Sequence, residues 1–124
     1  MWVMSDDRTG MDCVSLYDKR TDEYESGAVL SQESFPQYFE ALHSGRVIDA
    51  VDAFTDPRTS ELSDSYLEVL DVRSLLDATI RSNQDGSLLG VICAEMVGEQ
   101  RDWTHDETMF VAVSYTHLTL PTKA

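Results

Sequence analysis

The sequence predicts an α+β domain with a mostly antiparallel central sheet and helices on both faces of that sheet. The main indication is the stretch 74–97, in which two apolar, partly β-branched runs flank a polar turn with Asp85-Gly86 at its tip. Because glycine supplies the positive φ that tight hairpin turns require, this stretch predicts a β-hairpin. Both runs are apolar at successive positions, which is typical of strands covered on both faces. The remaining elements show no strict βαβ alternation, which favours the α+β class.

The N-terminal part of the chain predicts two short strands and a polar surface segment. Apolar runs at 2–4 and 11–17 are separated by turn-forming residues at 5–10, which is the pattern of strand, turn and strand. The polar stretch 18–31 is expected to finish a strand and then to form a surface loop.

A helix is expected over 34–44. Ser34 is the expected N-cap, Pro36 fits the first turn, and Gly45 is expected to end the helix in the left-handed conformation. Phe35, Tyr38, Phe39 and Leu42 follow helical spacing and form one apolar face. Tyr38 is therefore expected either to pack in the core or to contact a ligand.

The rest of the chain predicts elements on either side of the hairpin. A strand over 47–53 and a loop over 54–59 lead into a short amphipathic helix over 60–70. After the hairpin, Trp103 is expected to anchor the chain as an apolar contact. Thr104 and Glu107 have the spacing of a capping box, which predicts that a helix begins there.

The composition limits the kinds of partner. The chain has 124 residues, enough for one domain with a modest core, and its formal net charge of −14 opposes binding to nucleic acid or to an anionic membrane. No apolar run is long enough to cross a bilayer and no signal peptide is visible, so we expect a cytoplasmic protein. Cys13 and Cys93 are expected to be reduced and packed.

Few patterns in the sequence carry chemistry. The histidines His43, His105 and His117 share no metal-ligand spacing with one another or with the cysteines. A phosphate-binding loop, a GxSxG elbow and an HExxH motif are absent. We therefore expect no catalytic residue, no metal and no cofactor.

Asp77 is a candidate binding group because it interrupts an otherwise apolar strand. A buried carboxylate needs hydrogen-bond partners. Asp77 is therefore either satisfied by backbone N–H groups or an arginine, or it lies in a pocket and contacts a polar ligand. Because side chains alternate along a strand, Asp77 is expected to share a face with Leu75 and Thr79, and Cys93 to share a face with Glu95.

Two further carboxylates leave the same alternatives open. Asp52 lies at a strand end beside a loop, where it is either locally satisfied or part of a pocket. Asp56 precedes Pro57, and it is expected either to line a pocket or simply to cap the short helix.

A set of short motifs follows a consistent order along residues 2–112. They are Gly45-Arg46-Val47-Ile48-Asp49-Ala50, Asp52-Ala53, Asp56-Pro57-Arg58-Thr59, Tyr66-Leu67, Leu76-Asp77-Ala78, Gly90-Val91-Ile92-Cys93 and Trp103-Thr104-His105-Asp106-Glu107. The ordered set resembles a GAF domain of a bacterial signalling protein, of the kind that precedes a histidine kinase or a diguanylate cyclase output module.

The resemblance implies an antiparallel sheet with a ligand pocket on one face, dimerisation through terminal helices, and a sensory, non-enzymatic role. The implied partners are a small-molecule ligand, a linked output domain and a second copy of the chain. For such a sensory domain, the candidate ligand-binding residues are Tyr38, Asp52, Tyr66, Asp77 and Cys93.

Several positions depart from the family pattern. Thr79 stands where the family often has proline, and Ala94 and Met96 stand where polar residues or histidine are usual, which disfavours a histidine-based site. The patterns of tetrapyrrole attachment and of methionine sulfoxide reduction are not seen around Cys13 or Cys93. A structural dimerisation module without a ligand and a cysteine-dependent methionine sulfoxide reductase are the alternative functions.

Both ends of the chain also depart from the resemblance. The helix that precedes the first strand in family members has no counterpart here, and the closing helix is expected to stop near Ala112. The stretch 113–124 resembles the translation of a transposase sequencing adapter. We therefore expect an incomplete sensory domain over 1–112 and an artefactual, unstructured tail over 113–124.

Overall fold

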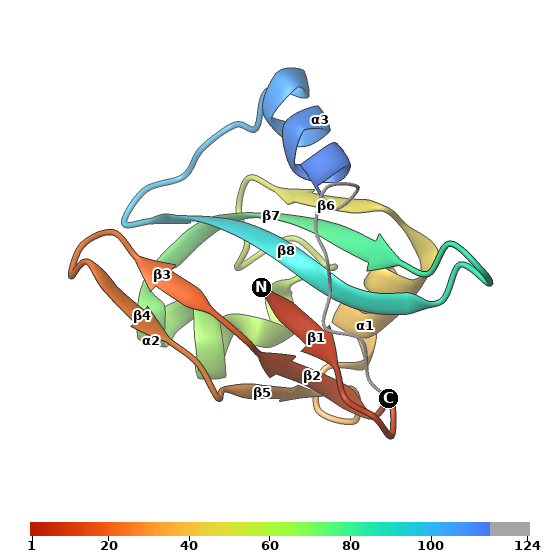
Figure 1. The fold of residues 1–124 in the computed structure, drawn as a ribbon. Coiled ribbons are helices and arrows are strands. Elements are labelled where there is room, and N and C mark those ends of the chain that lie inside the picture. The colour runs from red at the N-terminus through yellow and green to blue at the C-terminus, as the bar shows by residue number, and fades with distance from the viewer. Residues whose placement is uncertain (115–124) are drawn as a thin grey trace.

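The computed structural model of the protein describes residues 1–114 and builds them into a six-stranded antiparallel sheet, a separate two-stranded sheet and helices on both faces of the larger sheet (Figure 1). The elements are β1 (Trp2–Met4), β2 (Gly10–Cys13), β3 (Leu16–Asp18), β4 (Glu23–Glu25), β5 (Val29–Ser31), α1 (Pro36–Ser44), β6 (Val47–Ala50), the 3₁₀ turn η1 (Ser60–Leu62), the π-helical turn η2 (Ser63–Leu67), α2 (Glu68–Leu70), β7 (Val72–Arg81), β8 (Leu88–Val97) and α3 (His105–Ser114). The predicted α+β class is confirmed. The expected tail lies, apart from its first two residues, outside the described residues.

The predicted hairpin is confirmed and supplies two interior strands of the sheet. The strand order is β5-β2-β1-β8-β7-β6, so that β7 and β8 both have neighbours on each side. Gly86 lies in the connecting turn with φ +73°, the left-handed conformation that the hairpin prediction required of it. Asp77 lies opposite Cys93 and Leu75 opposite Glu95 in the antiparallel register. Side chains at such paired positions point to the same face of the sheet.

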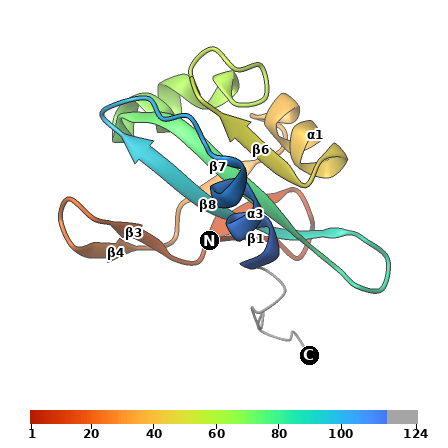
Figure 2. The same ribbon diagram turned by 90° about the horizontal axis from the view of Figure 1, so that it is seen from above.

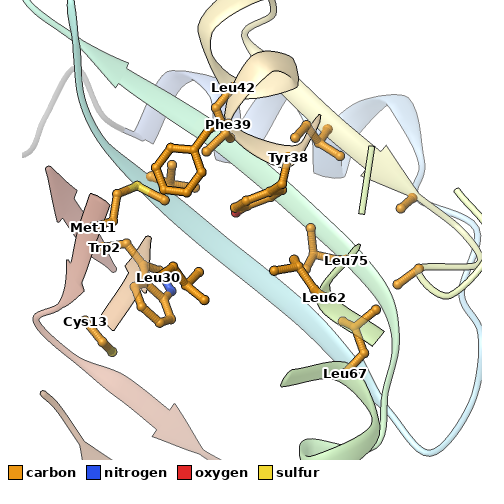
Figure 3. Packing of buried hydrophobic residues seen from close by; sticks show 14 of the residues in the cluster. Trp2, Met11, Cys13, Leu30, Tyr38, Phe39, Leu42, Leu62, Leu67 and Leu75 are labelled. Atoms are coloured by element: carbon orange, nitrogen blue, oxygen red, sulfur yellow. The ribbon is translucent and has the colours of Figure 1, made fainter. Parts of the chain in front are cut away.

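The two faces of the sheet are covered by different helices (Figures 1 and 2). Every residue of β7 from Ser74 to Ile80 is buried, as the successive apolar positions predicted. The face that carries Leu75 packs against α1 and the helical segment 60–70, and it forms the main core (Figure 3). The opposite face lies against α3, which contacts β6 and β7.

The ends of α1 differ from the prediction because their partners come from distant parts of the chain. Phe35, rather than Ser34, occupies the N-cap position, and the carboxylate of Glu61 in η1 accepts the backbone N–H of Tyr38 at 2.9 Å. Gly45 is extended, with φ −127°, so the predicted left-handed ending is wrong. The guanidinium of Arg81 donates to carbonyls in the last turn of α1 and just beyond it, including that of Gly45, which removes the need for a left-handed cap.

The polar stretch 18–31 is more ordered than predicted, and the short helix over 60–70 is less regular. Within the polar stretch 18–31, β4 pairs with β3 in a hairpin that projects from the sheet, and β5 adds to the main sheet. Tyr17 and Tyr24 pack with ring centroids 5.0 Å apart across that hairpin. The helix expected over 60–70 is present as the consecutive turns η1, η2 and α2.

The start of α3 follows the predicted capping box. The backbone N–H of Glu107 donates to Oγ1 of Thr104 at 3.1 Å, and the Glu107 carboxylate accepts the N–H of Thr104 at 3.0 Å. The indole N–H of Trp103 donates to the carbonyl of Ala50 at 3.3 Å. This contact fixes the chain before α3 against the end of β6, as expected for an anchor.

Candidate functional site

Asp77 lies at the centre of the sheet, on the face covered by α1 and η2. Its side chain has 0% exposed surface, although it is a carboxyl group. Oδ2 accepts a hydrogen bond of 2.5 Å from the hydroxyl of Tyr38, which α1 presents from above the sheet. Oδ1 has no hydrogen-bond partner among the residues that the structure describes. In place of the backbone N–H or arginine expected for a buried Asp77, a tyrosine hydroxyl holds Oδ2, and the Cys93 thiol on the neighbouring strand also favours the ionised carboxyl.

Burial dominates the protonation of Asp77. Removal from water raises the pKa of the Asp77 carboxyl to about 7, and the nearby negative charge of Glu95 acts in the same direction. The Cys93 thiol, the Tyr38 hydroxyl and the N-terminal ammonium group oppose this shift. Asp77 is therefore poised to exchange a proton near neutral pH.

A second tyrosine–carboxyl pair lies on the same face. The hydroxyl of Tyr66, in η2, donates to Oε1 of Glu95 at 2.5 Å. Burial raises the pKa of Glu95, and the hydrogen bond from Tyr66 opposes the shift. The ring of Trp2 meets the ring of Tyr66 edge to face, with centroids 6.1 Å apart.

Cys93 lies between the two pairs. It is paired with Asp77 across the strands and precedes Glu95 by two residues on the same face. Burial raises the pKa of the Cys93 thiol well above its ordinary value, and the neighbouring carboxylates add to the shift. Burial likewise raises the pKa of Cys13, which is also a free cysteine. Both thiols are therefore protonated and weakly nucleophilic at neutral pH.

Four of the five predicted ligand-binding residues come together with one that was not predicted. We call the group the carboxyl cluster; its members are Tyr38, Tyr66, Asp77, Cys93 and Glu95. Tyr38 and Asp77 are fully buried, whereas Tyr66, Cys93 and Glu95 are half-buried. The cluster is therefore closed at its Tyr38 end and reaches solvent at its Glu95 end.

The other carboxylates singled out in the sequence lie outside the carboxyl cluster. Asp52, predicted as a ligand-binding residue, lies in the turn after β6, where its Oδ1 accepts the backbone N–H of Phe54 at 3.1 Å. Asp56 does not cap the short helix with its side chain but pairs with Arg58 at 2.8 Å. Each of these two carboxylates thus has a local partner within two positions of it in the chain.

Two absences among the described residues, 1–114, bear on the kind of site. They contain no group of three or more His, Cys, Asp or Glu side chains arranged to hold a metal ion. Within the same range, no helix combines the length and the apolar character needed to span a membrane.

The family model of the GAF domain matches residues 6–118, and the chain therefore belongs to the GAF domain family. No curated protein sequence matches it.

Solved GAF domains share the fold at low sequence identity. The GAF domain of a two-component sensor histidine kinase from Bacillus halodurans is 21% identical, with a TM-score of 0.63 over 93% of this chain and 76% of that chain. The blue-light absorbing form of the PixJ GAF domain from Thermosynechococcus elongatus is 20% identical, with a TM-score of 0.64 over 90% of this chain and 65% of that chain. A far-red cyanobacteriochrome photoreceptor is 20% identical, with a TM-score of 0.56 over 90% of this chain and 67% of that chain. These similarities establish the fold, and this chain spans about two-thirds to three-quarters of each of those chains.

Proposed function

We propose that this GAF domain is a non-enzymatic sensory domain that binds a small molecule at the carboxyl cluster and regulates a linked signalling module. The observation that carries the proposal is Asp77, a carboxyl group with no exposed surface and one oxygen left without a partner among the described residues. An unsatisfied buried acceptor costs about 1–3 kcal/mol. A donor supplied by a ligand would recover that cost, which makes this position suited to recognition.

The surroundings of Asp77 support binding rather than catalysis. Cys93, the nucleophile nearest to Asp77 in the carboxyl cluster, has a raised pKa, which keeps it in the unreactive thiol form. This disfavours the alternative of a cysteine-dependent methionine sulfoxide reductase. A ligand bound between the sheet and α1 would act by favouring one packing of the helices over another, which is a shift of population.

The proposal is tested by NMR with a library of small ¹⁹F-labelled fragments and ¹⁵N-labelled protein. Binding at the carboxyl cluster should shift the amide signals of 75–79 and 91–95 together with those of Tyr38 and Tyr66. Fragments that bind only elsewhere, or no binding fragment at all, would contradict the proposal. In that case sedimentation of the unliganded chain as a stable dimer would favour the dimerisation module.

A further inference from the structure

We propose that the carboxyl cluster recognises a small organic cation, an ammonium or amidinium group on an apolar body, whose N–H donates to Oδ1 of Asp77. This inference rests on the proposed function and adds the chemical class of the ligand. Three observations carry it: the free acceptor, the two carboxyls without a basic side chain bonded to them, and the aromatic rings beside them.

The free acceptor requires a donor. An ionised carboxylate is an acceptor only, and Tyr38 already satisfies Oδ2, so a ligand that completes Asp77 must bring an N–H or O–H group to Oδ1. A carbonyl or carboxylate group on a ligand would instead face the acceptor with a second acceptor. When Asp77 is ionised, the geometry thus selects donors and disfavours anions.

The charge of the carboxyl cluster selects a cation among the donors. Among residues 1–114, the ion pairs of arginine side chains go to Asp18, Asp49, Asp56, Asp71 and Glu107, and none goes to Asp77 or Glu95. When ionised, the cluster therefore holds two negative charges to which no basic side chain of residues 1–114 is bonded, and the N-terminal ammonium is the cation that acts on them. The net charge of −14 adds a long-range field of the same sign.

Aromatic rings lie beside these charges. Tyr38 and Tyr66 each place a ring next to the carboxyl group to which its hydroxyl is bonded, and Trp2 packs against Tyr66. These rings supply apolar surface next to the carboxyls, which suits the apolar body of such a ligand. Half-buried Tyr66, Cys93 and Glu95 form the end of the cluster at which such a ligand would enter.

Protonation links this binding to pH. The titratable groups that face Asp77 are Tyr38 from α1, Tyr66 from η2, and Cys93 and Glu95 from β8, with the N-terminal ammonium of Met1 acting on the same carboxyls. The tyrosines and the thiol stay neutral up to high pH because their pKa values are raised. The change of charge near neutral pH therefore belongs to the Asp77 carboxyl, and a cation should bind more tightly as it ionises.

The test compares three probes of similar shape by ¹⁵N NMR titration: 2-phenylethylamine, 2-phenylethanol and 3-phenylpropionate. We expect the amine to bind at the carboxyl cluster at least about tenfold more tightly than the alcohol at pH 8, and the acid not to bind. Affinity for the amine should fall about tenfold between pH 8 and pH 6, as a group that titrates near 7 becomes protonated.

Variants separate Asp77 from the general charge of the protein. Asp77→Asn should weaken binding of the amine at least about tenfold and remove most of its pH dependence, whereas Asp12→Asn, the same change at an exposed position on β2, should leave both unchanged. Glu95→Gln, at a half-buried position, should weaken binding of the amine and keep the pH dependence set by Asp77. If the ¹⁵N NMR spectrum of Asp77→Asn is not that of a folded protein, Glu95→Gln tests the role of the carboxyls in its place.

Two outcomes separate failure of this inference from failure of the proposed function. Equal binding of amine and alcohol at the carboxyl cluster, or fragments that bind there while the amine does not, would overturn the cationic ligand and leave the sensory role standing. Absence of any fragment from the cluster would overturn both.

Discussion

The hydroxyl of Tyr38 donates a 2.5 Å hydrogen bond to the carboxyl of Asp77 and joins α1 to the central strand of the sheet through two fully buried polar groups. The two residues lie 39 positions apart in the chain. Oδ1 of Asp77 has no hydrogen-bond partner among the described residues, and the neighbouring Cys93 thiol also favours the ionised form of this carboxyl. The consequences of the bond between Tyr38 and Asp77 for stability and pH dependence are directly measurable.

Replacement of Tyr38 by phenylalanine should destabilise the domain. Tyr38→Phe removes the hydroxyl that donates to Oδ2 of Asp77. Oδ2 then lacks this hydrogen bond, at a cost of about 1–3 kcal/mol in unfolding free energy at pH 7. The loss should be smaller at pH 5, where the carboxyl is neutral and its hydrogen bond is weaker. Urea unfolding at the two pH values measures both effects, and Tyr24→Phe on the exposed hairpin is the matched control. Equal losses at both pH values would mean that the bond does not involve a titrating carboxyl.

Asp77 should make the domain less stable as the pH rises. The pKa of the folded state, about 7, lies above the value near 3.9 of an unfolded aspartate, so the folded protein binds more protons between these pH values. The contribution to stability is complete below about pH 4 and is lost as the pH rises through 7, to a total of at most about 4 kcal/mol.

The variant Asp77→Asn isolates this effect from the other carboxyls. The surface carboxyls with lowered pKa, such as Asp56, act with the opposite sign and lose their contribution as the pH falls. The difference in unfolding free energy between wild type and Asp77→Asn should therefore change steadily from pH 4 to pH 8, with wild type gaining relative stability toward acid. A difference that is constant over this range would contradict the raised pKa.

Two glycine substitutions distinguish an extended from a left-handed backbone. Gly45→Ala should be neutral or stabilise by up to about 1 kcal/mol, because Gly45 is extended and alanine restricts the unfolded chain. A Cβ there would meet the Ala41 carbonyl at 3.4 Å, an ordinary contact. Gly86→Ala should cost about 1–2 kcal/mol, since its φ is +73° and strain is the sole effect in open space. Thermal unfolding of the two variants measures these changes. A clear loss of stability in Gly45→Ala would indicate that α1 ends in the left-handed conformation after all.

The capping box of α3 should contribute a modest, local stabilisation. Thr104→Ala removes the acceptor for the N–H of Glu107 and should cost about 1 kcal/mol. Hydrogen exchange of the backbone amides in the first turn of α3 should be faster in Thr104→Ala than in the wild type. Thr108→Ala, the same substitution next to the capping box but at a side chain that takes no part in it, is the control. Unchanged exchange in Thr104→Ala would show that α3 is held by its packing on the sheet alone.

Local patterns in the sequence predicted the elements whose partners are near in the chain. The hairpin turn at Gly86 and the capping box at Thr104 depend on residues within a few positions, and both are present. The ends of α1 were predicted wrongly because Glu61 and Arg81, which satisfy them, lie 23 and 39 positions from the groups they bind. No local pattern contains such a partner.

The candidate site was predicted in outline and not in its pairing. Asp77 was recognisable because a carboxyl stands out in an apolar strand. Glu95 was seen to share a face with Cys93 and was still left out, because its partner Tyr66 lies 29 positions away and a glutamate near a strand end is unremarkable by itself. Asp52 was included on its place after a strand, and only the structure shows that it caps the turn at Phe54.

The most direct measurement is the titration of the Asp77 carboxyl itself, followed by its ¹³C chemical shift in protein labelled at aspartate. The buried, half-satisfied carboxyl described above should titrate near pH 7 in the free domain, and its midpoint should fall when 2-phenylethylamine is added. A midpoint near pH 4 would mean that water solvates Asp77, and the buried recognition group on which the proposed function depends would not exist.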